Sequence, residues 1–329
     1  MKKIILLLCL VMSTFVFAKK VVVEEDGGKI TYNEIDGEAH GKYTLQLEDG
    51  TVEKGTYVKG KVEGKVRRTY SDNSTEELIF VDGEPNGKFT FKSPDGEVEE
   101  GTYVAGVKQG KFRMKYSDGK IMESTYKDGI AHGKYIVKFS DGEIEEGTMV
   151  NGQAQGKFIR KIPGGSTLES ERVDGIVHGK YIVHYKDGTV EEGTYVKGTI
   201  EGKVKRTYPD NSTEELIFVD GKPNGKFINK FPDGSWTEGT YVNGDKEGKY
   251  RYIFAEKFEE EIEEGTYVKD RIQGKFTCKY KDGAILEGTY IDGQRKGKFI
   301  IKYPNGLSET GTFVNENLLK FDLWLIFLL

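Results

Sequence analysis

Cysteine is nearly absent from this chain, and hydrophobic residues are scarce for its length. The 329 residues include 2 cysteines, Cys9 and Cys278. We expect Cys9 to be removed with the N-terminal apolar segment, and a single remaining thiol excludes an internal disulfide. Hydrophobic residues make up only 36% of the chain and charged residues 31%. This composition is lean for a globular core, so sheet hydrogen bonds and packing along stripes must hold the fold.

Long apolar runs occur only at the two ends of the sequence. A basic start at Lys2 and Lys3 is followed by an apolar run and by the small residue Ala18, which is typical of a secretory signal peptide over residues 1–18. At the other end, residues 318–329 are almost wholly apolar, but about 12 residues cannot span roughly 30 Å of hydrocarbon. We therefore expect an exported protein of the periplasm, the outer surface or the medium.

A strong net charge is also lacking. The formal charge is -5, and loss of the two N-terminal lysines with the signal would make it about −7. A mildly acidic exported chain is a poor candidate for binding nucleic acid or anionic lipid.

What the sequence has in abundance is a repeat of about 23 residues. Its period is seen at a glycine that alternates with a larger residue, so that a second period of about 46 residues is superposed. The equivalent positions are Gly55, Leu78, Gly101, Ser124, Gly147, Ser170, Gly193, Leu216 and Gly239, followed after an insertion near Glu259 by Gly265, Gly288 and Gly311. The mature N-terminus, residues 19–31, matches the same pattern as a partial repeat.

Each repeat predicts two strands. Phe112, Met114 and Tyr116 alternate with basic residues, and this period of two is typical of a half-buried strand. Asp118-Gly119 then predicts a hairpin turn. In the other strand Gly101 lies on the face of its aromatic neighbours, where a missing side chain leaves room for a ring from the next strand. The sequence therefore predicts an all-β fold, an elongated single-layer antiparallel meander of tandem hairpins over residues 32–317.

The unit Tyr103-x-x-Gly106-x-x-x-Gly110-Lys111-Phe112, followed by Asp118-Gly119, resembles the MORN repeat. It is most similar to the bacterial variant found in exported proteins and in YwqK-like proteins, and the resemblance covers nearly all of residues 32–315. This resemblance implies a sheet of hairpins that binds or scaffolds without chemistry of its own. Bacterial members at the cell surface take part in attachment to host cells or invasion. Glu99 and Tyr103 stand where the eukaryotic unit has tyrosine and tryptophan.

The histidines suggest a metal site and a glycine–lysine motif suggests a phosphate-binding loop, but both sets of residues are explained more simply as recurring positions of the repeat. His40, His132 and His178 occupy one polar turn column; the last two lie about 20 Å apart, whereas zinc ligands lie about 2 Å from one ion. The recurring G-x-x-x-G-K string has three residues between its glycines, where a phosphate-binding loop has about four. We expect no metal, no cofactor and no enzymatic activity.

An aromatic stripe is the candidate binding surface. We expect these rings to form first of all the core. Because a single sheet has no second layer, part of the stripe would also stay exposed and mark a contact surface for a protein or other macromolecule. Its members are Tyr57, Tyr103, Phe112, Tyr135, Phe158, Tyr181, Tyr195, Tyr241, Phe276 and Phe299.

Two charged columns follow the same period. The lysines of the Lys42 column and the glutamates at Glu53, Glu99, Glu145 and Glu191 predict cross-strand pairs, with a recognition stripe as the alternative.

The apolar tail, Leu318–Leu329, has three interpretations. A degenerate last strand comes first, because apolar residues continue to alternate from Phe321 onward. The second is a tail that associates with a membrane or docks a partner, and the third is a shifted reading frame. The sequence thus favours an exported, non-enzymatic binding or scaffold protein acting in attachment to host cells. The alternative is a structural envelope protein that assembles through its sheet edges or this tail.

Overall fold

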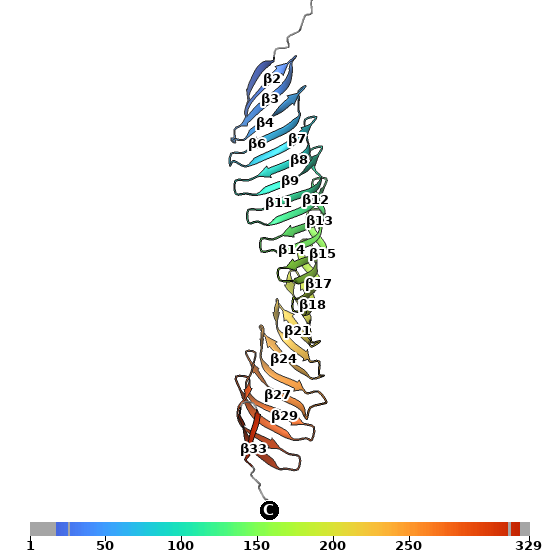
Figure 1. Ribbon diagram of the computed structural model, residues 1–329, viewed down its shortest axis with the longest axis vertical. Helices are drawn as coiled ribbons and strands as arrows, with labels where there is room; N and C mark the ends of the chain where they lie inside the picture. Colours follow the sequence, from blue (N-terminus) through green and yellow to red (C-terminus); the bar gives the residue numbers. More distant parts are fainter. Residues whose placement is uncertain (1–17, 26, 315–316, 323–329) are drawn as a thin grey trace, which may run out of the picture. The chain divides into compact units, whose positions relative to one another are not determined.

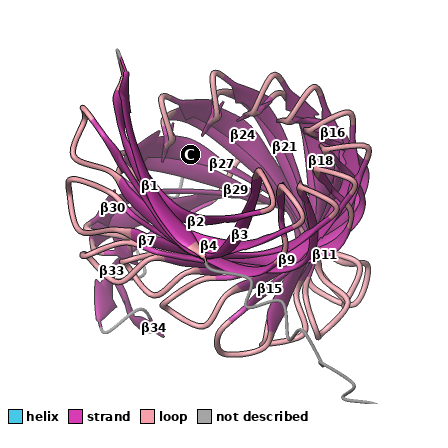
Figure 2. Cartoon of the chain, turned by 90° about the horizontal axis from the view of Figure 1, so that it is seen from above, coloured by secondary structure: helices cyan, strands magenta, loops and turns pink. Residues whose placement is uncertain are grey.

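The computed structural model describes residues 18–25, 27–314 and 317–322. Within these ranges every regular element is a β-strand, and Figure 2 shows short turns joining the strands without any helix. The predicted all-β fold of antiparallel hairpins in meander order is confirmed. The predicted signal peptide, except its last residue, and residues 323–329 of the tail lie outside the described residues.

The chain divides into two units, which comprise residues 1–140 with 149–153 and residues 141–148 with 154–329. In unit 1 each long strand pairs antiparallel with the next one along the chain. Its strands are β1 (Lys19–Glu25), β2 (Gly28–Ile35), β3 (Glu38–Leu47), β4 (Val52–Val58), β5 (Lys61–Val62), β6 (Gly64–Thr69), β7 (Thr75–Val81), β8 (Glu84–Lys92), β9 (Val98–Val104), β10 (Val107–Lys108), β11 (Gly110–Lys115), β12 (Ile121–Lys127) and β13 (Ile130–Lys138).

Unit 2 repeats the same meander, and two of its first strands, β14 (Ile144–Val150) and β15 (Gln153–Ile162), contain residues of both units. Its further strands are β16 (Ser166–Val173), β17 (Ile176–His184), β18 (Val190–Val196), β19 (Thr199–Ile200), β20 (Gly202–Thr207), β21 (Thr213–Val219), β22 (Lys222–Pro223), β23 (Gly225–Lys230), β24 (Trp236–Val242), β25 (Asp245–Lys246), β26 (Gly248–Ile253), β27 (Glu260–Val268), β28 (Arg271–Ile272), β29 (Gly274–Tyr280), β30 (Ile285–Ile291), β31 (Gln294–Arg295), β32 (Gly297–Lys302), β33 (Ser308–Val314) and β34 (Asn317–Asp322).

The two glycines of the G-x-x-x-G string have different tasks. Gly60 turns the chain together with Lys59, and both have positive φ, 79° and 49°. Gly64, with φ 75°, lies at a break between β5 and β6 where the pairing with β4 shifts, which is a β-bulge. Each such pair of short and long strands is therefore one strand with a bulge.

At the opposite end of the hairpins, the Asp-Gly turns are fastened by the aspartate. The carboxylate of Asp49 accepts a hydrogen bond from the Thr51 amide at 2.8 Å, and this bond lowers the pKa of Asp49. The same contact recurs at Asp187 with Thr189. The predicted turn is confirmed as a loop that is longer than a two-residue hairpin: the Leu47 amide donates to the Thr51 carbonyl, and the Gly50 amide donates to the Leu47 carbonyl.

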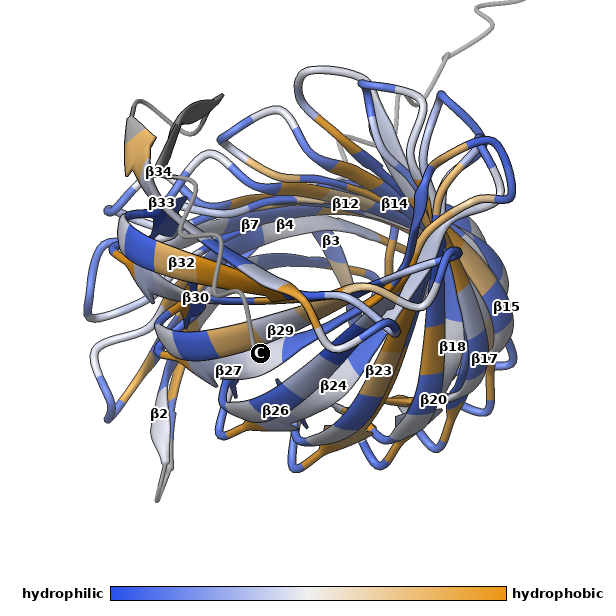
Figure 3. Cartoon of the chain, turned by 90° about the horizontal axis from the view of Figure 1, so that it is seen from below, coloured by the Kyte–Doolittle hydropathy of each residue, from blue (hydrophilic) through white to orange (hydrophobic). Residues whose placement is uncertain are grey.

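Alternation along the strands gives each unit two chemically different faces, visible as bands of hydropathy in Figure 3. One face, here called the aromatic face, carries the ring of the G-K-[FYV] step. The other, here called the polar face, carries the lysine of that step. The twist of each sheet, which Figure 1 shows as a gradual change in strand direction, is the expected right-handed strand twist.

The core lies on the aromatic face and is built from complementary volumes in adjacent strands. Tyr181 lies opposite Gly193, and a Cβ on that glycine would lie 2.6 Å from the tyrosine ring. Where the ring is replaced by Val204, the opposite residue is Leu216. The predicted space for a ring above a glycine is thus confirmed, and a smaller side chain is matched by a larger one.

The N-terminal partial repeat is displaced by one position. Lys42 lies opposite Thr56, and a strict 23-residue period would place Lys19 opposite Asn33, but it is Lys20 that lies there. At the C-terminus, β34 pairs with β33 and places Gly311 opposite Phe321.

Candidate functional site

Most of the predicted aromatic binding stripe is interior. Phe112, Tyr135, Phe158, Tyr181, Phe276 and Phe299 are buried, with at most 4% of each residue exposed. The four tyrosines of the other strand, Tyr57, Tyr103, Tyr195 and Tyr241, are half-buried. The six buried rings form the core, which is the first role expected of the stripe, and the part of it left to a contact surface is the four half-buried tyrosines.

The buried rings are covered by residues of their own sheet. Several lie against an aromatic ring of the neighbouring strand, as in the pair Tyr181 and Tyr195 with ring centroids 4.8 Å apart and the pair Phe299 and Phe313, also 4.8 Å apart. A lysine of a short strand then lies over the rings: the ammonium of Lys108 in β10 is 5.0 Å from the Phe112 ring, and that of Lys246 in β25 is 4.7 Å from the Phe227 ring. These cation–π contacts close the aromatic face without a second layer.

The glutamate column also lies on the aromatic face and not beside the lysine column. Glu191 is buried, accepts a hydrogen bond from the Tyr181 hydroxyl at 2.8 Å, and pairs with Arg206 at 2.7 Å. Burial and this hydrogen bond raise the pKa of Tyr181. The predicted pairing of the two columns is therefore wrong, because the lysine of the G-K step points to the opposite face.

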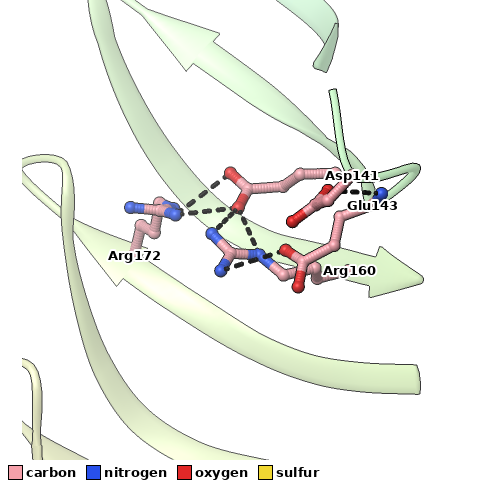
Figure 4. Close-up of polar contacts among 5 residues, drawn as sticks. Asp141, Glu143, Arg160 and Arg172 are labelled. Carbon is pink, nitrogen blue, oxygen red and sulfur yellow. Dashed lines mark hydrogen bonds and ion pairs between the residues drawn. The ribbon is translucent and has the colours of Figure 1, made fainter. Parts of the chain in front are cut away.

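The contacts of Glu145 reach far along the chain, and Figure 4 labels the two arginines that make them, Arg160 and Arg172. Glu145 lies 2.6 Å from Arg160 and 3.0 Å from Arg172, and Arg160 also approaches Glu143 at 3.8 Å. The Arg172 guanidinium lies 4.7 Å from the Phe158 ring. Two arginines thus neutralise one carboxylate that is 4% exposed, as a buried charge requires. The network is structural in character, since its groups are paired and enclosed.

The column that contains the histidines joins successive turns. Nδ1 of His178 accepts a hydrogen bond from the Lys197 amide at 3.3 Å, and Glu201 accepts one from the Asp220 amide at 2.9 Å. Gln109 donates to Asp128 in the same place. The prediction of a turn position is wrong for the histidines, because His40, His132 and His178 lie in β3, β13 and β17, each directly before a glycine of positive φ. No group of three or more His, Cys, Asp or Glu side chains suited to a metal occurs in the described part of the chain.

Cys278 lies in β29 and is fully buried. Burial, followed by the nearby Glu263 carboxylate, raises its pKa to about 12. A thiol with that pKa is protonated at neutral pH, so Cys278 serves as a small apolar residue of the core.

The polar face of each unit carries a row of lysines, here called the lysine–threonine row because most of the printed partners are threonines, whereas Lys65 and Lys203 lie opposite isoleucines and Lys157 opposite Glu171. Lys88 faces Thr102, Lys111 faces Thr125, and in unit 2 Lys226 faces Thr240. The lysines recur on every second long strand, about 10 Å apart. The row is Lys42, Lys65, Lys88, Lys111, Lys134, Lys157, Lys180, Lys203, Lys226, Lys249, Lys275 and Lys298.

Clefts follow this row in both units. One of about 660 Å³ in unit 1 is lined by three lysines of the row, Lys88, Lys111 and Lys134. A cleft of about 630 Å³ in unit 2 is lined by Lys226, Lys249 and Lys275. A third, of about 550 Å³, continues from Lys275 to Lys298 in unit 2. The same concave surface is therefore built more than once from the repeated sequence.

The clefts hold more cationic than acidic side chains, although the whole chain has a formal charge of -5. In the unit 1 cleft, Arg113 lies 4.0 Å from Glu100 and 3.8 Å from Glu123, so the charge of this arginine offsets the charges of the two glutamates. Within the described residues no ion pair reaches Lys88 or Lys111, whose amines remain available to a ligand. The arrangement is suited to binding anionic groups spaced along an extended molecule.

No family model and no curated protein matches this chain. Among solved structures, the TCP10 domain of Danio rerio CPAP is similar at 14% identity over 68% of this chain and 94% of that chain, with a TM-score of 0.26. The TCP domain of Drosophila melanogaster SAS-4 (dCPAP), solved with a proline-rich motif of Ana2, shares 14% identity over 59% of this chain and 99% of that chain, with a TM-score of 0.24. Scores this low carry no argument about this protein.

Proposed function

We propose that this chain is an exported, non-enzymatic protein that binds an extended acidic polysaccharide along its polar face. The observation that carries the proposal is the recurrence of one cleft composition. The unit 1 cleft and the larger unit 2 cleft each bring together three lysines of the lysine–threonine row, one arginine and two glutamates.

Repetition suits a repetitive ligand. A linear polymer with carboxylate or sulfate groups at regular intervals can meet successive lysines about 10 Å apart, and threonine hydroxyls beside them can accept and donate hydrogen bonds to sugar hydroxyls. Many weak contacts then add along the array. The signal sequence, the resemblance to exported MORN-like repeats and this surface together favour attachment to a cell-surface glycan.

Binding is tested on the purified chain with immobilised polygalacturonate and heparin, and with neutral dextran for comparison. We expect retention on the acidic polymers that weakens as salt is added, because exposed charges are screened. Replacing Lys226 and Lys249 by glutamine should weaken binding on the order of fivefold, if each contact contributes about 0.5 kcal/mol.

A matched control replaces two other lysines of unit 2 by glutamine, Lys186 of a turn and Lys222 of β22. This changes the net charge equally but leaves the larger unit 2 cleft intact. Equal weakening by the two double variants would show only a net-charge effect and would overturn the proposed site. Failure of the unmodified chain to bind any acidic polysaccharide, or a preference for DNA over all of them, would overturn the proposed ligand.

A further inference from the structure

The first strand of unit 1 has an open edge. β1 pairs with β2 on one side, and within the described residues no strand pairs with its other side. An edge strand presents unpaired N–H and C=O groups, which can accept another strand. Natural edges are commonly protected by charges of one sign, which repel a second copy of the same strand.

β1 has an unusual charge order. It reads Lys-Lys-Val-Val-Val-Glu-Glu from Lys19 to Glu25. In an antiparallel pair of two such strands, the basic start of one meets the acidic end of the other. We propose that β1 pairs antiparallel with β1 of a second copy of this chain, so that two molecules form a symmetric dimer joined edge to edge.

The register of this pairing follows from ladder geometry. Residues that face each other in an antiparallel ladder must both direct their backbone N–H and C=O groups toward the partner strand or both away from it. One strand can therefore shift along the other only in steps of two residues. With Val22 on the two-fold axis, Val21 lies opposite Val23, Lys20 opposite Glu24, and Lys19 opposite Glu25. This register pairs the whole strand, whereas a shift in either direction shortens it and places charged residues opposite valines.

The exposed side chains of β1 agree with that register. Val22 is 50% exposed and would gain apolar contact with its own copy across the axis. Glu24 forms an ion pair with Lys29 of β2, yet 67% of its side chain remains exposed and can also meet Lys20 of the second copy. Parallel pairing would instead place lysine beside lysine, which is unfavourable.

The dimer is tested by sedimentation equilibrium of the purified chain from roughly 1 to 100 µM, because one pair of edge strands buries less than about 1,200 Å² and should associate weakly. Two charge-reversed variants are compared: Lys19→Glu with Lys20→Glu, and Glu24→Lys with Glu25→Lys. Each alone should dimerise at least about tenfold more weakly, since like charges then face each other. An equimolar mixture of the two should dimerise again, because every facing pair regains opposite charges.

The control variant reverses the charges of Lys186 and Lys222 by replacing both with glutamate. These residues are far along the chain from β1, so dimerisation should be unchanged. Circular dichroism confirms that every variant keeps its sheet. If the chain with an unaltered β1 stays monomeric up to about 100 µM, the inference is overturned. So would a mixture of the two variants that remains monomeric, or single variants that dimerise like the unmodified chain.

Discussion

The complementary volumes at the centre of each sheet predict the effect of filling the space above a glycine. Phe227 in β23 is fully buried and lies opposite Gly239 in β24. A Cβ on Gly239 would lie 2.6 Å from Cε1 of the Phe227 ring, and contacts under 3.0 Å are essentially never seen for real Cβ atoms. Gly239→Leu must therefore displace the ring, and over-packing of this kind costs about 1–3 kcal/mol.

The opposite change at the same pair removes volume. Phe227→Val deletes most of a ring that has no exposed surface and should cost about 2–4 kcal/mol, somewhat less than truncation of a buried phenylalanine to alanine. The double variant, Phe227→Val with Gly239→Leu, reproduces the arrangement of Val204 opposite Leu216, where both residues are 1% exposed. We expect it to be more stable than the sum of the single effects by about 2 kcal/mol.

Urea unfolding followed by the fluorescence of Trp236, which lies in β24, measures these free energies. The reciprocal exchange, Val204→Phe with Leu216→Gly, is the matched control and should show coupling of the same sign. Strict additivity at both sites would refute the reasoning, because it would mean that the facing residues do not share one space.

Three further predictions concern the buried charges and the thiol of unit 2. Arg295→Met leaves Glu263, which is 5% exposed, without its cation and should lower the free energy of unfolding in urea by about 3 kcal/mol at pH 7. Burial and then the Glu263 charge raise the pKa of Tyr290 to about 12 in the folded chain. The protonated Tyr290 hydroxyl therefore stabilises the fold fully below the unfolded pKa of about 10, and this contribution should be lost as pH rises from about 10 to 12. Tyr290→Phe should therefore reduce the alkaline loss in thermal unfolding. Cys278, whose pKa is raised to about 12 mainly by burial, should react with a thiol reagent at pH 8 only as fast as the sheet opens, measured as a labelling rate that urea accelerates.

Each of these has a control that isolates its cause. Arg271→Met, at an exposed arginine, is the control for Arg295→Met. It should lower the free energy of unfolding by less than about 0.5 kcal/mol. An alkaline profile unchanged by Tyr290→Phe would contradict the assigned pKa shift. For the labelling experiment Cys9 is replaced by serine, and immediate reaction of Cys278 in the native chain would show that its burial is not maintained.

Much of the local structure is predictable from the sequence, since it depends on neighbours along the chain. Alternation at Phe112, Met114 and Tyr116 predicts a strand at any position of the array, and β11 is that strand. Asp118-Gly119 predicts a turn because few residues adopt positive φ, and Gly119 has φ 88°. The missing side chain at Gly193 similarly predicts a neighbouring ring, which Tyr181 supplies.

The candidate site was less accessible to sequence reasoning. The aromatic residues have the composition of a contact stripe, but whether a ring is exposed depends on what reaches over it. Lys108 and Arg172 come from other strands to cover Phe112 and Phe158. In the sequence, the pairing of Val204 with Leu216 is visible as a matched exchange of sizes in two columns, and together with the glycines opposite the rings it points to a closed core.

The sequence by itself thus determined the elements, their order and which residues share a face, because alternation and turn chemistry act over a few residues. Only the tertiary structure decided which face is closed and which is hollowed. Glu145 pairs with Arg172, which lies 27 residues further along the sequence, and the unit 1 cleft is lined by Lys88 and Lys134 from strands that are not consecutive in the sequence. Such contacts depend on the twist of the sheet and the reach of long side chains, which no local pattern specifies.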